Sequence, residues 1–74
     1  MQVVLITRQG CHLCDEALAA LNALGIEPEL RDVDADTELH RLYDWRVPVI
    51  LSDGRVVAEG RTDQAALRKV LPAV

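Results

Sequence analysis

The sequence has no phenylalanine and only one tryptophan and one tyrosine, so it offers little for stacking the bases of a single-stranded nucleic acid. It also lacks a basic cluster and carries a formal net charge of −4, which argues against a nucleic-acid partner. No apolar run approaches the length of a membrane span, and we expect no membrane association. Residues 2–7 are too short for the apolar segment of a secretion signal, have no basic leader and run directly into Arg8. We therefore expect a cytoplasmic protein.

A chain of 74 residues has room for one domain, which we expect to span residues 1–74 and to act as a monomer. Its two cysteines, Cys11 and Cys14, have two residues between them. A loop this short removes little chain entropy when it is closed, so the pair is a poor structural staple. Without a secretion signal, this spacing indicates redox chemistry or metal binding.

The first third of the chain predicts a strand followed by a helix. Residues 3–6 are a continuous apolar run, typical of a strand buried on both faces. Helical spacing follows, and Gly25 is well placed to end that helix. The apolar face of the helix consists of Cys14, Ala17, Leu18, Leu21 and Leu24.

The middle of the chain predicts an edge strand and a short helix. Residues 29–33 form a strand candidate polar enough for the edge of a sheet. Either Asp34 or Asp36 can cap the helix that follows. The residues expected on its buried face are Leu39, Leu42 and Tyr43.

The last third predicts a hairpin and a final helix. Residues 48–51 and 55–58 are short strands joined by Asp53-Gly54, a strong signal for a two-residue hairpin turn. Thr62 is expected to cap the last helix, and Pro72 to mark its end. The residues expected to point inward are Ala66, Leu67, Val70 and Leu71. The order β-α-β-α-β-β-α predicts an α/β fold with a mixed four-stranded sheet and helices on its faces.

Cys11 is expected at the N-terminus of the first helix. Backbone N–H groups there lack internal partners, and together with the helix dipole they favour a thiolate. Cysteines so placed titrate at about 3.5–7.5 instead of about 8.5. Arg8 and a protonated His12 add positive charge, whereas Asp15 and Glu16 oppose the effect.

Cys14 follows one helical turn later, on nearly the same face as Cys11. Neighbours at this spacing lie about 5–6 Å apart, which suits a disulfide. Cys11 would attack a substrate disulfide as a thiolate, and the more buried Cys14 would resolve the mixed disulfide.

Two other interpretations remain open. A structural zinc site needs four ligands, and only His12 and His40 could add to the cysteines, so we expect no metal within a single chain. A metal ion or iron–sulfur cluster carried through Cys11 and shared between two chains is an alternative. The thiols could also be inert in an interaction module. In such a module Trp45 would be the surface aromatic, unless it anchors the short helix against the sheet.

The whole arrangement resembles a glutaredoxin-like member of the thioredoxin superfamily. Three motifs carry the resemblance: Cys11-His12-Leu13-Cys14, Val47-Pro48-Val49 and Gly60-Arg61-Thr62-Asp63. The Cys-x-Leu-Cys motif is similar to that of a group of small bacterial glutaredoxin-like proteins. The resemblance implies a thioredoxin-like, glutaredoxin-type fold of three layers.

The resemblance also implies roles for the residues that match the motifs. Cys11 corresponds to the nucleophile and Cys14 to the resolving cysteine. Arg8 occupies the position of a basic residue used against a glutathione carboxylate. Val47 precedes Pro48, the proline that in this superfamily is cis and faces the cysteines, and the backbone of Val47 would pair with a bound thiol peptide.

At the last helix, Thr62 and Asp63 match the polar pair that receives the other end of glutathione. His12, beside the nucleophile, completes the expected substrate-binding set. The resemblance implies a thiol–disulfide oxidoreductase that acts on protein or glutathione mixed disulfides. It would hold no bound cofactor and would take electrons from glutathione or thioredoxin.

The chain departs from the dithiol glutaredoxin pattern at three places. His12-Leu13 replaces a Pro-Tyr pair, so the aromatic side chain beside the nucleophile is missing. Arg46 stands where a threonine is common, and Glu59 where a first glycine is common.

Overall fold

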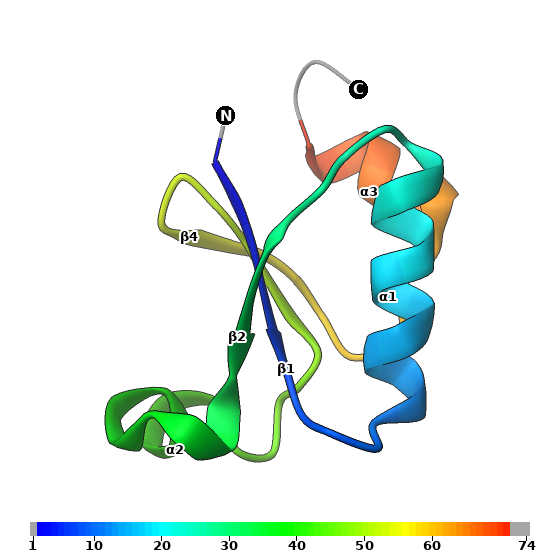
Figure 1. The fold of residues 1–74 in the computed structure, drawn as a ribbon. Helices are drawn as coiled ribbons and strands as arrows, with labels where there is room; N and C mark the ends of the chain where they lie inside the picture. Colours follow the sequence, from blue (N-terminus) through cyan, green and yellow to red (C-terminus); the bar gives the residue numbers. More distant parts are fainter. Residues whose placement is uncertain (1, 72–74) are drawn as a thin grey trace.

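The computed structural model describes residues 2–71. The elements in chain order are β1 (Val3–Thr7), α1 (His12–Ala23), β2 (Glu29–Asp32), the 3₁₀ turn η1 (Val33–Ala35), α2 (Thr37–Tyr43), β3 (Val49–Ser52), β4 (Arg55–Glu59) and α3 (Gln64–Val70) (Figure 1). The predicted order β-α-β-α-β-β-α is therefore confirmed. Pro72, expected to mark the end of the last helix, lies outside the described residues. None of the helices within residues 2–71 combines the length and apolar character that crossing a bilayer requires.

The four strands form one mixed sheet in the order β2-β1-β3-β4. β1 pairs with β2 in parallel and with β3 antiparallel, and β3 and β4 form an antiparallel hairpin. The hairpin turn is Asp53-Gly54, and both residues have positive φ angles of 51° and 85°. Positive φ at both central positions is what a two-residue turn of this hand requires, so the hairpin prediction is confirmed.

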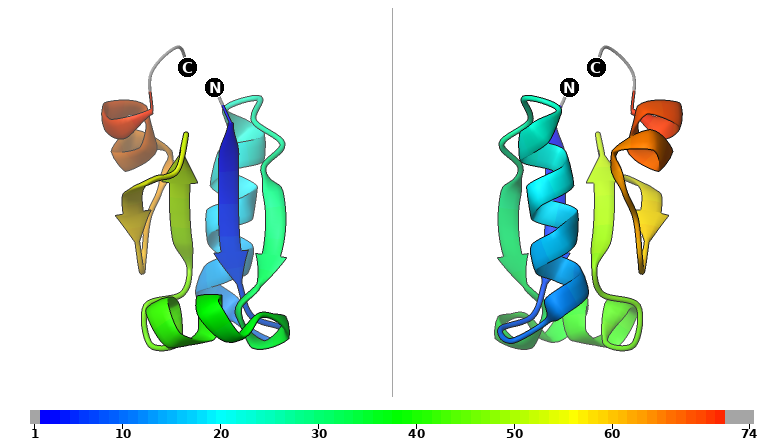
Figure 2. Two further views of the ribbon diagram at one scale, coloured as in Figure 1. Left: turned by 90° about the vertical axis from the view of Figure 1, so that its left-hand side faces the viewer. Right: turned by 90° about the vertical axis from the view of Figure 1, so that its right-hand side faces the viewer.

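Helices cover both faces of the sheet and produce three layers. α1 and α3 lie on one face, whereas η1 and α2 lie on the other (Figures 1 and 2). The first core contains Val3, Leu5, Ala17, Leu21, Ile50, Leu67 and Leu71. The second contains Ile6, Val33 and Val49, with Leu39 and Tyr43 packed against it. β1 contributes to both cores, because successive side chains of a strand point to opposite faces.

The end of α1 follows the predicted pattern. Gly25 has a φ angle of 81°, in the region that glycine enters without steric cost. Its N–H donates to Asn22 O at 2.9 Å, and the N–H of Ile26 donates to Leu21 O at 2.9 Å. These two bonds close the helix as a Schellman motif.

The interior face of α2 is narrower than the sequence predicted. Asp36 is the N-cap, and its carboxylate accepts the N–H of Leu39 at 3.0 Å. Leu39 and Tyr43 face the second core, but Leu42 is 40% exposed, so its predicted burial is wrong. A helix of seven residues packs along a single i, i+4 line, and Leu42 lies beside that line.

Two predictions for α3 are also wrong. The N-cap is Asp63 and not Thr62: Asp63 Oδ1 accepts the N–H of Ala66 at 2.9 Å. Leu67 and Leu71 are buried, but Ala66 and Val70 are exposed. This short helix contacts α1 and β4 along one side only, so one i, i+4 pair suffices to cover it.

Candidate active site

The sulfur of Cys11 lies at the N-terminus of α1. Cys11 is the N-cap residue, with extended backbone angles, and its Sγ accepts the N–H of Cys14 at 3.1 Å. Its own N–H donates to Arg8 O at 3.1 Å, and its carbonyl accepts the N–H of Asp15 at 3.2 Å. An amide that lacks an intrahelical partner therefore points at the sulfur, as the sequence predicted.

The two cysteines form a disulfide, and their Cα atoms are 5.2 Å apart. This confirms that the spacing brings them within bonding distance. Cys11 is partly exposed, whereas Cys14 is 1% exposed on the buried face of α1. A substrate that approaches this end of the helix therefore meets the sulfur of Cys11 first.

His12 is the first residue of α1, and its side chain is 85% exposed. Its Nε2 lies 2.8 Å from Glu16 Oε2, one helical turn further on. The positive charge that a protonated His12 brings to this end of the helix is therefore shared with a carboxylate.

Pro48 lies at the same end of the sheet as the cysteines. The Val47–Pro48 peptide bond is cis, as the resemblance implied, and Pro48 is fully buried. The residue after it, Val49, pairs with Ile6 near the end of β1, and β1 leads directly into the loop that carries Cys11. The carbonyl of Pro48 accepts the N–H of Gly60 at 2.8 Å, which fixes this segment to the end of β4.

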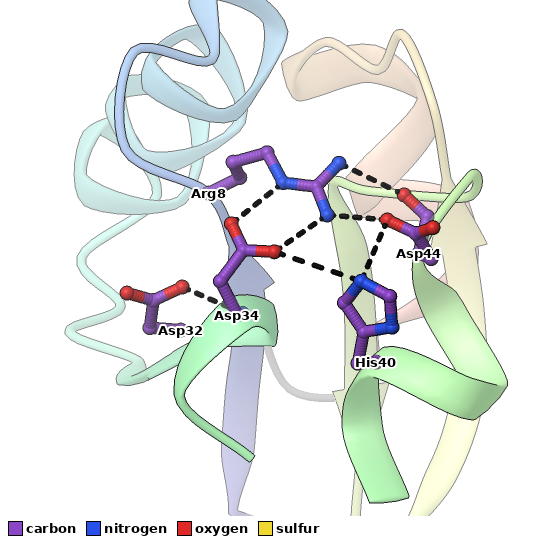
Figure 3. Close-up of polar contacts among 5 residues, drawn as sticks. All are labelled: Arg8, Asp32, Asp34, His40 and Asp44. Carbon is purple, nitrogen blue, oxygen red and sulfur yellow. Dashed lines mark hydrogen bonds and ion pairs between the residues drawn. The ribbon is translucent and has the colours of Figure 1, made fainter. Parts of the chain in front are cut away.

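The guanidinium of Arg8 lies between two carboxylates (Figure 3). Its Nε and Nη2 donate to the two carboxylate oxygens of Asp34, both at 2.8 Å. Nη1 donates to Asp44 O at 3.1 Å, and Nη2 also contacts the Asp44 carboxylate. The hydrogen bonds from Arg8 hold the pKa of Asp34 below its ordinary value, and those to Asp34 and Asp44 raise the pKa of Arg8. Arg8 thus joins β1 to η1 and α2.

His40 completes this ion-pair cluster. Its Nε2 lies 3.4 Å from Asp44 Oδ1 and 3.9 Å from Asp34 Oδ1 (Figure 3). Oxygen and nitrogen atoms of these three side chains lie within 4.8 Å of one another, which is a spacing that a metal ion could use. Arg8 already supplies positive charge to both carboxylates, so the cluster is satisfied by its own residues.

The two departures at positions 46 and 59 pair with each other. Nε and Nη2 of Arg46 donate to Glu59 Oε2 at 2.9 and 2.6 Å, and its guanidinium lies 5.1 Å from the centre of the Tyr43 ring. The hydrogen bond to Glu59 raises the pKa of Arg46. Sequence reasoning missed this pair, because only the pairing of Val49 with Glu59 brings the two ends of the hairpin together.

Thr62 and Asp63 lie where α3 begins. The Asp63 carboxylate caps the helix, and Thr62 Oγ1 is buried without a hydrogen-bond partner among residues 2–71. A shallow hollow between α1 and α3 is lined by both residues together with Glu16. The two residues therefore face the flank of α1, a short distance along the helix from Cys14.

Trp45 lies in the segment between α2 and β3, and it is 93% exposed. The expectation that it anchors the short helix against the sheet is therefore wrong. Tyr43 and Leu39 fill that position instead.

Solved structures and a family model identify the family of this chain. A comparison with curated proteins gave no match. Among solved structures, the X-ray structure of Northeast Structural Genomics target protein XcR50 from X. campestris is 35% identical, with a TM-score of 0.85 over 97% of both chains. The solution structure of the same target is 36% identical, with a TM-score of 0.82 over 100% of this chain and 96% of the other.

A third structure, the NMR structure of protein Ne2328 from Nitrosomonas europaea, is 32% identical, with a TM-score of 0.79 over 95% of this chain and 89% of the other. The family model described as Glutaredoxin-like domain (DUF836) matches residues 2–72. Together with the mixed sheet and three layers, these matches show a thioredoxin-like fold. The chain belongs to the glutaredoxin-like domain family.

Proposed function

We propose that the protein is a dithiol–disulfide oxidoreductase that reduces protein or glutathione mixed disulfides through Cys11 and Cys14. The observation that carries the proposal is the environment of the Cys11 sulfur. This atom is partly exposed, accepts the N–H of Cys14 at a helix N-terminus and is bonded to a buried second sulfur. A hydrogen bond to a charged acceptor is stronger than one to a neutral acceptor, so the amide favours the thiolate in the reduced protein.

The reaction starts from the reduced protein. The Cys11 thiolate attacks one sulfur of the substrate disulfide, the substrate S–S bond breaks, and the departing thiolate takes a proton from solvent. Cys14 then loses its proton, and its sulfur attacks Cys11 Sγ in the mixed disulfide. The second substrate sulfur leaves as a thiolate and is protonated. Two electrons have passed to the substrate, and the protein holds the Cys11–Cys14 disulfide.

Turnover requires a reductant that returns two electrons to this disulfide. Glutathione or a thioredoxin-type dithiol would supply them by the same exchange in reverse. Both donors are kept reduced in the cytoplasm, where we place the protein.

The substrate would lie along the Val47-Pro48 segment that leads into β3, with its backbone beside that of Val47. Arg8 can contribute one further hydrogen bond to a substrate carboxylate. A guanidinium has five N–H donors, and the contacts with Asp34 and Asp44 use four of them. Thr62 and Asp63, which line the hollow between α1 and α3, are the second polar pair that we assign to glutathione.

Matched serine variants of the two cysteines test the proposal. We expect Cys11→Ser to abolish reduction of insulin and of a glutathione–peptide mixed disulfide. Cys14→Ser should retain the first attack and accumulate a mixed disulfide that mass spectrometry detects on Cys11. Reduction of both substrates by Cys11→Ser at the wild-type rate would overturn the proposal.

A further inference from the structure

Trp45 is the most exposed large apolar side chain among residues 2–71. It is 93% exposed, whereas the other exposed large apolar side chains range from 39% for Val70 to 53% for Leu30. A tryptophan carries about 150–250 Å² of surface, and tryptophan is enriched among the residues that dominate binding energies. Neither core contains Trp45.

The backbone next to Trp45 is linked to the cysteine loop through Arg8. The carbonyl of Asp44, which is bonded to the nitrogen of Trp45, accepts a hydrogen bond from Arg8 Nη1 at 3.1 Å. The carbonyl of Arg8 in turn accepts the N–H of Cys11 at 3.1 Å. One residue therefore connects the backbone at Trp45 to the N-cap of α1. The start of α1 and the segment that enters β3 lie at the same end of the sheet (Figures 1 and 2).

The backbone on both sides of Trp45 is fixed. Before it, the N–H of Asp44 donates to His40 O at 3.1 Å. After it, the N–H of Arg46 donates to Tyr43 O at 2.9 Å, and the Arg46 side chain is held by Glu59. Because the backbone is already fixed, the ordering cost when a partner covers Trp45 is limited to its own side chain, which favours binding.

We infer that Trp45 docks an apolar side chain next to the disulfide cysteine of an extended polypeptide, so that polypeptide disulfides are preferred over glutathione disulfides. This inference rests on the proposed function and names its substrate class. Glutathione has no apolar side chain for Trp45 to cover. It also carries two carboxylates, and the arginines that flank this segment are already balanced: Arg8 by Asp34 and Asp44, and Arg46 by Glu59. These three carboxylates outnumber the two guanidiniums, so the segment has no net positive charge that would attract the negatively charged glutathione.

Two synthetic peptides test the inference. They are matched in length and charge, are each supplied as the symmetric disulfide of one peptide so that attack on either sulfur leaves the peptide on Cys11, and have leucine or serine next to the cysteine. The measured quantity is the kcat/KM for the leucine peptide divided by that for the serine peptide. We expect Trp45→Ala to lower this ratio about tenfold, equivalent to about 1.4 kcal/mol. Leu30→Ala, which truncates an exposed apolar side chain on β2, is the matched control and should leave the ratio unchanged.

Fluorescence provides a second, direct readout, because Trp45 is the only tryptophan in the sequence. In the Cys14→Ser variant, the trapped mixed disulfide with the leucine peptide should shift Trp45 emission to shorter wavelength, and that with the serine peptide should not. An unchanged ratio in Trp45→Ala together with no emission shift overturns the docking role and leaves the proposed function standing. A wild-type protein that reduces neither peptide overturns both.

Discussion

Reduction of the Cys11–Cys14 disulfide should change the stability of the fold by an amount that depends on pH. The disulfide closes a loop of only four residues, and the chain-entropy relation gives a stabilisation of about 2 kcal/mol for a loop of this size. The oxidised protein should therefore be the more stable form wherever the reduced thiols are neutral.

The reduced protein has a compensating interaction of its own. The N–H of Cys14 points at the sulfur of Cys11, and a hydrogen bond to a charged acceptor contributes about 1.5–3 kcal/mol. Since the folded chain favours the anion, this stability is present at pH above the ordinary value for free cysteine, about 8.5, and is lost as the pH falls. At pH 8 only part of the stabilisation from this hydrogen bond is present. The advantage of the oxidised form should thus shrink by about 1 kcal/mol between pH 5 and pH 8.

Urea denaturation followed by far-UV circular dichroism measures this difference, with the reduced samples kept in a phosphine reductant. Apart from the buried Cys14, the other ionisable groups are the same in both forms, so their contributions largely cancel in the difference. The reduced Cys11→Ser variant is the control, because a serine hydroxyl does not ionise in this range. An oxidised-minus-reduced difference that stays constant from pH 5 to pH 8 would refute the argument that the helix start stabilises the thiolate.

Three further predictions concern the scaffold. Leu21→Ala removes a fully buried side chain between α1 and the sheet, and in a urea titration it should lower the free energy of unfolding by about 2–5 kcal/mol. Leu30→Ala, the exposed control, should change the free energy of unfolding by at most about 0.5 kcal/mol in the same titration. Asp63→Ala removes the N-cap of α3 and should cost about 1 kcal/mol in thermal melts, whereas Asp63→Asn keeps an acceptor and should restore most of it. Arg8 lowers the pKa of Asp34, so this carboxylate stabilises the fold above its ordinary pKa, and the contribution is lost as the pH falls through the lowered value. The loss of stability on acidification below about pH 4 should therefore be smaller in Asp34→Asn, and an unaltered acid profile would speak against the ion pair.

Much of the fold was predictable because it depends on local chemistry. The apolar run of β1, the i, i+4 face of α1, the glycine at position 25 and the Asp53-Gly54 turn each act within a few residues. The same holds for the proximity of the cysteines: residues three apart at the start of a helix are neighbours, and the Cα atoms of Cys11 and Cys14 are 5.2 Å apart, within the range of a disulfide.

Predictions about the short helices were less successful, because the burial of their side chains depends on which neighbouring elements the helix packs against. Leu42 and Val70 are apolar and have helical spacing, yet each lies beside the single line of contact that a seven-residue helix makes. Thr62 and Asp63 are both good capping residues. We expected Thr62, but the cap is Asp63, and the choice depends on where the chain leaves β4 and turns toward α1.

By itself, the sequence determined the order of the elements and the geometry of the Cys11–Cys14 pair, because short-range backbone constraints set both. Only the tertiary structure decided which charged side chains form ion pairs. Arg8 reaches residues 26 and 36 positions away, and Arg46 reaches Glu59 across the hairpin. These contacts fix the segment that presents Trp45. They depend on the register and order of the strands, which long-range packing of the two cores establishes and no local pattern encodes.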